Sequence, residues 1–452
     1  MNPDLQQSLV GQLAALPSAG ALRVCVAYSG GLDSTVLLHL LAGLREQSGV
    51  PGFELRALHV NHGLSDYADE WEAECAASCR RLDVPFTAFG VEVARTDEMG
   101  LEAAARESRY AVFEQSLEDG EYLLLAQHQD DQLETVLLQL MRGAGVKGLA
   151  AMPAEAALGA GRLLRPLLEC SRQDLAVYGE QHGLQWIDDP SNFDTGFDRN
   201  FLRHEVLPVL KRRWPSAALT TARSARWCAE ADALCAALAE TDAADVLQGR
   251  RLSVAGLLAL APARQRNLLR YAITSAGLAL PPETRLQEVL GSMLVAAEDA
   301  APVVDWPGVS VRRYRGELFV LPQAAVAAPS ADRFELPADE RLNLGGAAGS
   351  LQLTAGDSGL RLRLNALPLT VRFRQGGERL RPAGGDNSRS LKNLLQEGGV
   401  LPWMRGALPL LYAGDELIAI ADIWVAEGWQ AAAGEAGYTV DWRPAGEVVA
   451  AA

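Results

Sequence analysis

The sequence contains no apolar segment long enough to cross a membrane. A transmembrane helix needs about 20 consecutive apolar residues, and no run in this chain approaches that length. The first 20 residues also lack the basic start that precedes the apolar core of a secretory signal, since the first cation is Arg23. We therefore expect a cytoplasmic protein without a membrane partner.

Cysteine is scarce in the sequence. The chain has six cysteines among 452 residues, and none of them belongs to a Cys-x-x-Cys pair. This usage argues against a disulfide framework and gives no sign of an iron–sulfur site. Cys75 and Cys79 lie four residues apart on an expected helix, where we interpret them as small, half-buried residues.

A net positive charge is also missing. The formal net charge is −16 at pH 7, which argues against nonspecific binding of nucleic acid but leaves room for local basic patches. Residues 199–226 hold seven Lys or Arg against one acid, and residues 361–412 hold nine against three, so each segment carries +6. Taken alone, either segment is equally consistent with ordinary solvated surface.

The sequence does contain a regular alternation of short apolar runs and amphipathic stretches over its first 140 residues. Strands are predicted at 23–29, 54–61, 85–93 and 121–128, and helices at 32–47, 66–81, 101–118 and 130–143. Such βαβ units form a parallel sheet that is covered by helices on both faces. In these sheets, ligands bind at the carboxyl ends of the strands.

A chain of this length is expected to form two or three domains. Trp214-Pro215 marks a boundary, the Ala- and Leu-rich residues 216–300 are predicted to be helical, and residues 325–340 form a Pro/Ala linker. Short strands with Gly-rich turns follow. We predict an α/β nucleotide-binding domain, a helical domain and a small α+β domain, at 1–215, 216–325 and 340–445.

The segment Ser29-Gly30-Gly31-Leu32-Asp33-Ser34 joins the first strand to the first helix of this alternation. Two glycines let the backbone turn tightly and approach an anion, and the start of the helix offers free N–H groups and the positive end of the helix dipole. Asp33 would repel a bare phosphate, so its presence suggests a Mg²⁺ ion between carboxylate and phosphate. The alternative is a tight turn in which Asp33 or Ser34 caps the helix.

Three other groups of polar residues belong to expected strand ends or helices. His59 to Leu64 ends the second strand, Arg106 and Arg109 lie close together on a helix, and Asp130 and Asp131 follow the fourth strand. An arginine can bind a phosphate or a carboxylate, and paired carboxylates can hold a metal ion or a cationic substrate. Each group has a plainer alternative: a loop histidine, a surface ion pair or a helix cap.

The sequence Ser-Gly-Gly-x-Asp-Ser after a strand resembles the signature of the PP-loop family, or N-type ATP pyrophosphatases, which cleave ATP between the α- and β-phosphates. The blocks SGGLDS, HVNHGL, ARESRY, AQHQDDQLET, RGAG, DDPSN and RNFLR, in this order, resemble the tRNA(Ile)-lysidine synthetase family. The resemblance is dense over residues 20–215 and resumes at 372–403. Many members have His where Gln127 stands, which leaves the role of that position open.

This resemblance implies an α/β PP-loop domain that ligates free L-lysine to the wobble cytidine of isoleucine tRNA with a CAU anticodon. The C2 carbonyl oxygen of cytidine would attack the α-phosphate of ATP–Mg²⁺ and release pyrophosphate. The lysine ε-amine would then attack C2 and release AMP. The wobble base would be splayed out of the anticodon loop to reach the site. Some relatives dimerise, so the resemblance also allows a homodimer.

The resemblance also implies roles for individual residues. Ser29 to Ser34 would bind the phosphates of ATP, and Asp33 would help to hold Mg²⁺. Arg106, Asp130 and Asp131, with Asp33, would be catalytic and would contact lysine, the metal ion or the adenylated base. The tRNA would be held by cations that orient its phosphates, namely Arg199, Arg203, Arg372, Arg374, Arg379, Arg381, Lys392 and Arg405.

Two other classes of protein remain as alternatives. Another PP-loop enzyme, either a tRNA thiolase or a ligase that adenylates a small metabolite, would share the loop. Thiolases of this type generally carry Cys-x-x-Cys pairs, which this chain lacks, and a metabolite ligase would leave the two basic segments unexplained. A non-catalytic nucleotide-binding module would keep the Gly-rich turn but would have little use for Asp33 together with Asp130 and Asp131.

Overall fold

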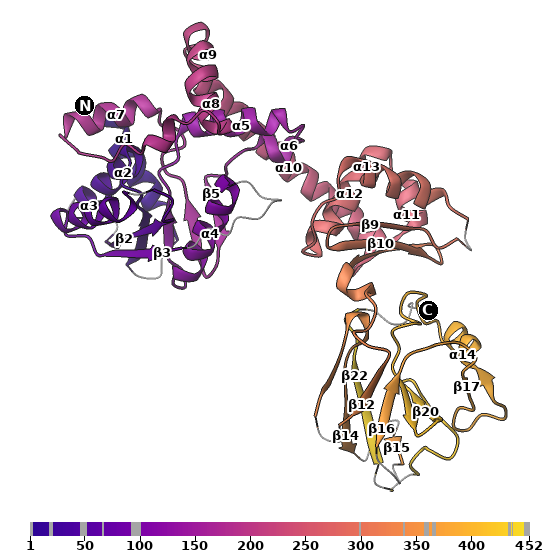
Figure 1. Cartoon of the computed structure of the whole chain (residues 1–452). Helices are drawn as coiled ribbons and strands as arrows, with labels where there is room; N and C mark the ends of the chain where they lie inside the picture. The colour runs from indigo at the N-terminus through magenta and orange to yellow at the C-terminus, as the bar shows by residue number, and fades with distance from the viewer. Residues whose placement is uncertain are drawn as a thin grey trace. The chain divides into compact units, whose positions relative to one another are not determined.

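The computed structural model of the protein divides into two compact units, Met1–Leu234 and Cys235–Ala452 (Figure 1). The N-terminal unit contains the predicted parallel sheet, and the C-terminal unit consists of antiparallel sheets and short helices. The structure describes residues 3–17, 21–45, 52–65, 67–91, 101–297, 300–337, 340–356, 361–363, 368–432, 435 and 437–446.

Six strands form the sheet of the N-terminal unit: β1 (Leu22–Ala27), β2 (Phe53–Asn61), β3 (Phe86–Gly90), β4 (Tyr122–Leu124), β5 (Glu155–Leu158) and β6 (Gly161–Leu164). Their order across the sheet is β3-β2-β1-β4-β6-β5. The first five in this order are mutually parallel, and β5 runs antiparallel to β6. The predicted parallel sheet is therefore confirmed. The short hairpin of β5 and β6 was not predicted, because strands of four residues give no periodic signal in an Ala/Gly-rich stretch.

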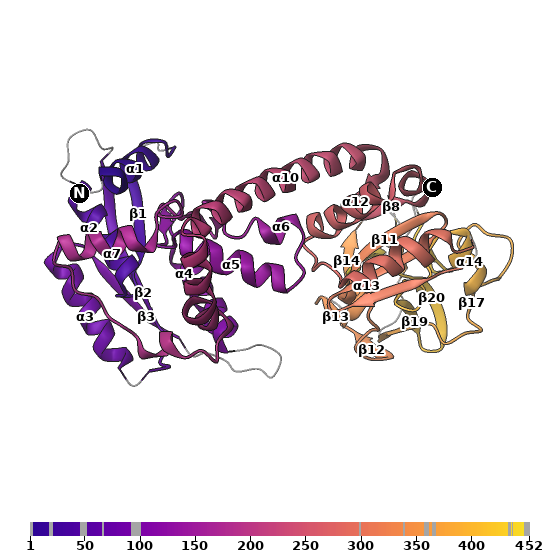
Figure 2. The same cartoon turned by 90° about the horizontal axis from the view of Figure 1, so that it is seen from above.

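Five helices pack against this sheet: α1 (Pro3–Ala14), α2 (Leu32–Leu44), α3 (Ala68–Arg81), α4 (Leu101–Ser116) and α7 (Arg172–Gln181). Alternate residues of β1 point to opposite faces. Val24 and Val26 pack with α1, α2, α3 and α7, whereas Cys25 packs with α4. Figure 2 shows β1, β2 and β3 between these two groups of helices. Because both faces are covered here, the strand is apolar from Val24 to Ala27.

The remaining helices of the N-terminal unit are α5 (Gln129–Met141), α6 (Val146–Leu149), α8 (Asp198–Phe201), α9 (Leu207–Arg213) and α10 (Ala217–Val246), the last of which continues into the C-terminal unit. Leu133 of α5 packs with Leu207 and Ala218, so α5 is held against the starts of α9 and α10. Although α10 has 30 residues, no helix in the described part of the chain is both long and apolar enough to cross a membrane.

The first part of the C-terminal unit contains the predicted helices and a sheet that was not predicted. The helices are α11 (Val254–Ala259), α12 (Pro262–Ser275) and α13 (Glu283–Glu288). The sheet has the order β7-β8-β11-β10-β9, with β7 (Leu247–Gln248), β8 (Arg251–Ser253), β9 (Val303–Trp306), β10 (Val309–Tyr314) and β11 (Glu317–Pro322). The strands β7 and β8 have two and three residues, which is too short for a strand signal in an Ala/Leu-rich sequence.

The second part of the C-terminal unit is the predicted α+β region. Its sheets have the orders β12-β16-β19-β20-β21, β13-β14-β22-β15 and β17-β18. Its elements are β12 (Arg333–Leu336), β13 (Leu342–Gly345), β14 (Gly349–Gly356), β15 (Arg361–Leu362), β16 (Leu369–Arg372), β17 (Arg379–Leu380), β18 (Arg389–Ser390), α14 (Leu391–Glu397), β19 (Leu410–Ala413), β20 (Glu416–Ile420), β21 (Trp424–Val425) and β22 (Gly437–Arg443).

The strand β11 belongs to the cores of both parts of this unit. Leu318 and Val320 pack with α11, α12 and α13, whereas Phe319 packs with the strands that follow. The ring of Phe319 is fully buried and meets Trp403 edge-on at a centroid distance of 4.9 Å. Because this sheet contributes side chains to a hydrophobic core on each of its faces, it joins the two parts of the C-terminal unit. This explains why the two parts form one compact unit. The three predicted domain ranges stay a prediction.

Candidate active site

The loop between β1 and α2 depends on Gly30. This residue has a φ of +81°, in the left-handed region that other side chains disfavour. A Cβ atom at this position would lie 2.6 Å from Ile187 Cδ1 and 2.7 Å from Cys75 Sγ. The Gly30 carbonyl accepts hydrogen bonds from the Ile187 N–H at 2.9 Å and from the Thr35 hydroxyl at 3.2 Å. The loop is therefore fixed between α3 and the segment that follows α7.

The two serines of the loop bind each other and the loop backbone. Ser29 Oγ and Ser34 Oγ are 3.1 Å apart, and Ser34 Oγ donates to the Gly31 carbonyl at 3.0 Å. The side chain of Leu32 is buried in the core, so its contribution to the loop comes from its backbone. The first N–H groups of a helix have no acceptor within the helix. At the start of α2 they form the kind of site that binds an anion.

Asp33 lies in the first turn of α2, and its two oxygens have different surroundings. Oδ2 is 3.4 Å from His128 Nε2. Oδ1 is buried and has no hydrogen-bond partner within the described residues. A buried carboxylate oxygen without a partner is costly. The arrangement is therefore incomplete until a cation or a donor reaches Oδ1.

His128 caps α5 and connects this helix to Asp33. Its Nδ1 accepts from the Asp131 N–H at 3.4 Å, and Asp131 Oδ2 accepts from the His128 N–H at 3.0 Å. This reciprocal cap leaves Nε2 facing Asp33. Burial by itself lowers the pKa of His128, but the carboxylates of Asp131, Asp33 and Glu134 together raise it above its ordinary value.

Glu134, one turn further along α5, binds two arginines. Its carboxylate accepts from Nε of Arg199 and from Nε of Arg203, each at 2.8 Å. Both guanidinium groups also lie near Asp131 Oδ1, at 3.4 and 3.6 Å. Burial alone would lower the pKa of each arginine, but the two carboxylates raise it. The four charges compensate one another, as charges removed from water must. We call Asp33, His128, Asp131 and Glu134 the carboxylate–histidine cluster.

Asp130 faces a different set of partners from its neighbour Asp131. Its Oδ1 forms an ion pair with Lys211 of α9, and its Oδ2 accepts from the backbone N–H of Arg172 at 3.0 Å. The side chain is almost fully buried. The structure thus places Asp130 between α7 and α9, with both oxygens in use.

Arg106 lies on α4, outside the carboxylate–histidine cluster. Its guanidinium lies over the ring of Tyr110, 4.7 Å from the centroid, and donates to the Tyr110 hydroxyl at 3.3 Å. The same hydroxyl accepts from the buried Arg165 at 3.3 Å, and Arg165 Nε donates to Gln127 Oε1. Within the described residues, Arg106 is exposed and forms no ion pair.

Burial lowers the pKa of both histidines at the end of β2, His59 and His62. His59 is buried and its Nδ1 lies 2.9 Å from the Tyr28 carbonyl oxygen, to which it donates. His62 Nε2 accepts from Nε of Arg109 at 3.3 Å, which a protonated imidazole cannot do. Burial, followed by the charge of Arg109, lowers the pKa of His62 to about 4. The imidazole therefore positions the second arginine of the ARESRY block.

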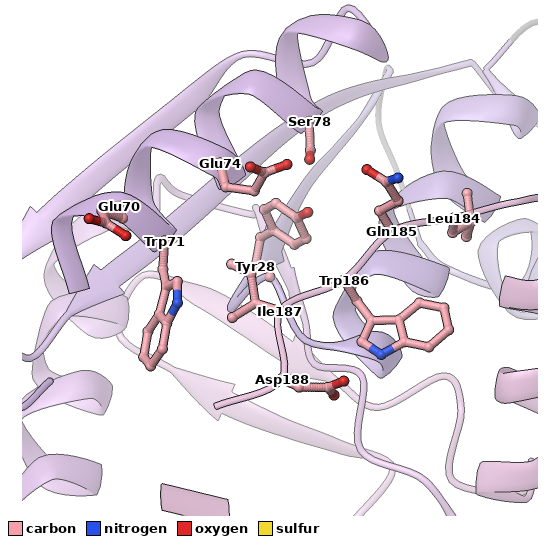
Figure 3. Close-up of a pocket in the computed structure, with 11 residues that line it drawn as sticks. Tyr28, Glu70, Trp71, Glu74, Ser78, Leu184, Gln185, Trp186, Ile187 and Asp188 are labelled. Carbon is pink, nitrogen blue, oxygen red and sulfur yellow. The ribbon is translucent and has the colours of Figure 1, made fainter. Parts of the chain in front are cut away.

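A pocket of about 630 Å³ opens beside Gly30. Figure 3 shows two tryptophans on either side of Tyr28 and Ile187. Glu74 has one cation nearby, the exposed Arg81, whose guanidinium nitrogen lies 3.9 Å from Glu74 Oε1. Glu70 and Asp188 form no ion pair within the described residues. The wall is therefore aromatic and negatively charged. The residues that give it this character are Trp71, Trp186, Glu70, Glu74 and Asp188.

Three family models match the chain. They are a PP-loop domain over residues 2–210, a TilS substrate binding domain over 252–319 and a TilS substrate C-terminal domain over 369–442. The chain is 43% identical to a tRNA(Ile)-lysidine synthase of Coxiella burnetii, with 93% of each chain covered, and 44% identical to one of Alkalilimnicola ehrlichii, with 96% of each covered. A third relative, from Serratia proteamaculans, is 42% identical over 98% of this chain and 99% of its own length.

The chain belongs to the tRNA(Ile)-lysidine synthase family. The family predicted from the sequence is thus confirmed. The matched PP-loop domain implies that the N-terminal unit binds ATP. The predicted α/β PP-loop fold is confirmed as well, because the parallel sheet and its loop lie inside the matched residues.

The sequence analysis of this lysidine synthase family member assigned no role to two residues of the carboxylate–histidine cluster. His128 and Glu134 both belong to the block AQHQDDQLET. The spacing of Asp131 and Glu134, three apart on a helix, was a signal that they share a face. Arg199 and Arg203, predicted to contact tRNA, are four apart and share a face in the same way. That these two faces meet was not visible in a single sequence.

The predicted tRNA contacts of the C-terminal unit lie on and around β16, β17 and α14. Three of them are exposed: Arg379, Arg381 and Lys392. The other three are half-buried and interact within their own fold: Arg372 with the Tyr412 ring, Arg374 with the charge of Glu378, and Arg405 with the Val400 carbonyl. Their role in binding tRNA stays a prediction.

We expect Gly30→Ala to weaken ATP binding by about tenfold or more, because a strained φ costs about 1–3 kcal/mol and the new Cβ also displaces Ile187. Isothermal titration calorimetry with ATP measures the change. Gly183→Ala is the matched control, since its φ of +60° brings the same backbone strain but its Cβ would have no atom within 4 Å. Equal ATP affinities of Gly30→Ala and the parent protein would contradict the geometry.

His62 is expected to stay neutral down to about pH 5. Its folded pKa of about 4 lies below the ordinary value of 6.5, so the unfolded chain binds more protons between these values. The free energy of unfolding therefore rises with pH between about 4 and 6.5 and loses this contribution as the pH falls. ¹H–¹⁵N NMR titration of the imidazole, assigned with His62→Gln, measures the pKa. A midpoint near 6.5 would refute the expectation.

Proposed function

We propose that this chain ligates free L-lysine to C2 of the wobble cytidine in isoleucine tRNA with a CAU anticodon, through an adenylated cytidine. Its full-length relatives are named tRNA(Ile)-lysidine synthases. The structural observation that carries the proposal is the meeting of two helix starts, where Asp33 of the PP-loop lies 3.4 Å from His128 of α5. This meeting lies at the carboxyl edge of the sheet, where such folds bind ligands, and it supports our assignment of these residues to nucleotide activation.

In this proposal, the loop from Ser29 to Ser34 binds the phosphates of ATP through backbone N–H groups at the start of α2. The C2 carbonyl oxygen of cytidine forms a bond to the α-phosphorus, and pyrophosphate leaves with the electron pair of the broken P–O bond. The amine of lysine then forms a bond to C2 and loses a proton. AMP departs with the electron pair of the C2–O bond.

The residues present fit a Mg²⁺ ion at the loop. Asp33 Oδ1 is buried and lacks a partner within the described residues, and Mg²⁺ is commonly bound by one or two carboxylates together with substrate phosphates. Asp33 is the residue that would hold the ion. When bound, the ion would neutralise charge that develops on the departing pyrophosphate.

We place the lysine substrate in the pocket beside Gly30. Lysine carries a positive charge, and the pocket offers the carboxylates of Glu70, Glu74 and Asp188 with little compensation from protein cations. The faces of Trp71 and Trp186 favour an ammonium group as well. The lysine carboxylate needs a cation. The exposed Arg106, which has no ion pair in the described part of the chain, is our candidate for this contact or for a phosphate.

The two neighbouring aspartates receive different roles. Asp131 belongs to the carboxylate–histidine cluster, where it fixes His128 and two arginines around the nucleotide loop. Asp130 has both oxygens in use by Lys211 and Arg172. We therefore propose that Asp130 is a positioning residue that anchors α9, rather than a group that touches substrate.

The thiolase alternative is less well supported than lysidine formation. Thiolase chemistry needs a reactive thiolate, whereas the three cysteines of β1 and α3, namely Cys25, Cys75 and Cys79, are buried. Burial raises the pKa of each of these thiols to about 12, so they stay protonated at neutral pH. That free lysine is the second substrate, and that the protein forms a homodimer, are also parts of the proposal.

Incorporation of radiolabelled lysine into isoleucine tRNA with a CAU anticodon, in the presence of ATP and Mg²⁺, tests the proposed function. We expect label on this tRNA and none on methionine tRNA. Asp33→Asn should lower the rate by about 100-fold or more, since the variant loses a charge aimed at the ion and phosphates. Asp119→Asn, an exposed acid that follows α4, is the control. A protein that binds ATP but incorporates no label would overturn the proposal.

Glu74→Gln tests the lysine pocket. We expect the KM for lysine to rise about tenfold, corresponding to 1.4 kcal/mol, because an opposite charge is removed, while the KM for ATP stays the same. Steady-state kinetics with each substrate varied in turn separates the two constants. Glu180→Gln, an exposed acid of α7 outside the pocket, should change neither constant. An equal rise in both constants for Glu74→Gln would argue against the assignment.

A further inference from the structure

One stretch of the chain has a charge pattern that the proposed reaction does not use. Residues 206–229 contain five Lys or Arg and no Asp or Glu, in a chain whose net charge is −16. The stretch includes α9 and the first turns of α10. A local positive field of this kind attracts a polyanion even when the whole protein is negatively charged.

The structure divides these cations into two groups. Lys211 is taken up by Asp130, and Arg226 lies 3.8 Å from Glu169, with both side chains exposed. Arg212, Arg213 and Arg223 are exposed and form no ion pair within the described residues. Their charges are therefore available to a ligand.

Two exposed tryptophans accompany these arginines. Trp214 is 58% exposed and Trp227 is 56% exposed, although large aromatic side chains usually contribute to a core. The Arg213 guanidinium lies 5.7 Å from the Trp214 ring centroid, and the Arg223 guanidinium lies 5.6 Å from that of Trp227. Each tryptophan ring is thus exposed to solvent and has a guanidinium group beside it.

We propose that these two arginine–tryptophan pairs, Arg213 with Trp214 and Arg223 with Trp227, together with the exposed Arg212, bind unpaired nucleotides of the tRNA. Proteins bind single-stranded RNA by stacking bases on aromatic rings and on guanidinium planes, while further cations contact the phosphates. The identity of the RNA rests on the proposed function, because a wobble base that enters the active site must leave its stack. Bases next to it are then unpaired and accessible.

A second copy of the chain is the other occupant to consider for an exposed apolar surface. Two copies related by a two-fold axis would bring the same patch together, and the unpaired arginines would then face one another. Like charges brought together away from water repel strongly. Charge complementarity therefore favours RNA over self-association.

Binding of a fluorescently labelled CAU anticodon stem-loop, followed by anisotropy, tests this proposal on the full-length protein. We expect Trp214→Ala and Trp227→Ala each to raise the Kd about tenfold, and Trp227→Phe to retain most of the affinity because a ring remains. Arg223→Gln should weaken binding and reduce the dependence of log Kd on log salt by about one. Leu258→Ala, a similarly exposed apolar residue on α11, should change nothing.

A duplex with the same stem but no loop provides the second arm of the experiment. The tryptophan variants should bind this duplex as the parent protein does, whereas Arg223→Gln should bind it less tightly. Unchanged stem-loop affinity in both tryptophan variants would overturn the proposal. So would an equal loss for stem-loop and duplex, or a change of oligomeric state in light scattering without a change in RNA affinity. If the protein does not incorporate lysine but the tryptophan variants still lose affinity for the stem-loop alone, the proposed reaction is refuted and the proposed RNA-binding surface is supported.

Discussion

The site depends on the contact between Asp33 and His128, because this contact joins the starts of two helices. The helix α2 follows β1 and α5 follows β4, and these strands are parallel neighbours, so the sheet brings both helix N-termini to one edge. Each N-terminus favours an acid in its first turn, which Asp33 and Asp131 supply. Two carboxylates this close to one imidazole would repel each other in its absence. His128 therefore allows both helix starts to keep their acids.

The same logic extends along α5 to Glu134. A carboxylate that is 1% exposed needs a positive partner, and Arg199 and Arg203 provide two. These arginines come from the segment after the parallel sheet, so the carboxylate–histidine cluster depends on chain that the sheet itself does not contain. Removing Glu134 would leave two guanidinium groups, whose nearest remaining acid is Asp131. The segment around α8 is thus held in place by charge as well as by the apolar contacts of α9 and α10.

The sequence was most informative where one local pattern determines the structure. The alternation of strands and helices predicted the parallel sheet, and the glycines of Ser29 to Ser34 predicted a tight turn, because these depend on neighbours in the chain. Contacts between segments that are distant in the sequence could not be predicted from it. Nothing local shows that Ile187 packs on Gly30, that Lys211 pairs with Asp130, or that the short strands β7 and β8 extend a sheet formed by β9 to β11.

The basic segment shows how structure refines a charge count. Arg199, Arg203 and Lys211 neutralise buried carboxylates, so they contribute little to the field that a polyanion meets. Arg213 and Arg223 lie beside exposed tryptophans and keep their full charge toward solvent. The net charge of +6 over residues 199–226 is thus the sum of two unlike groups. Arginines four residues apart that pair with a buried acid stabilise the fold, whereas arginines beside an exposed aromatic ring are free to contact a ligand. The partner of each guanidinium, which the sequence does not show, therefore distinguishes a structural arginine from a binding one.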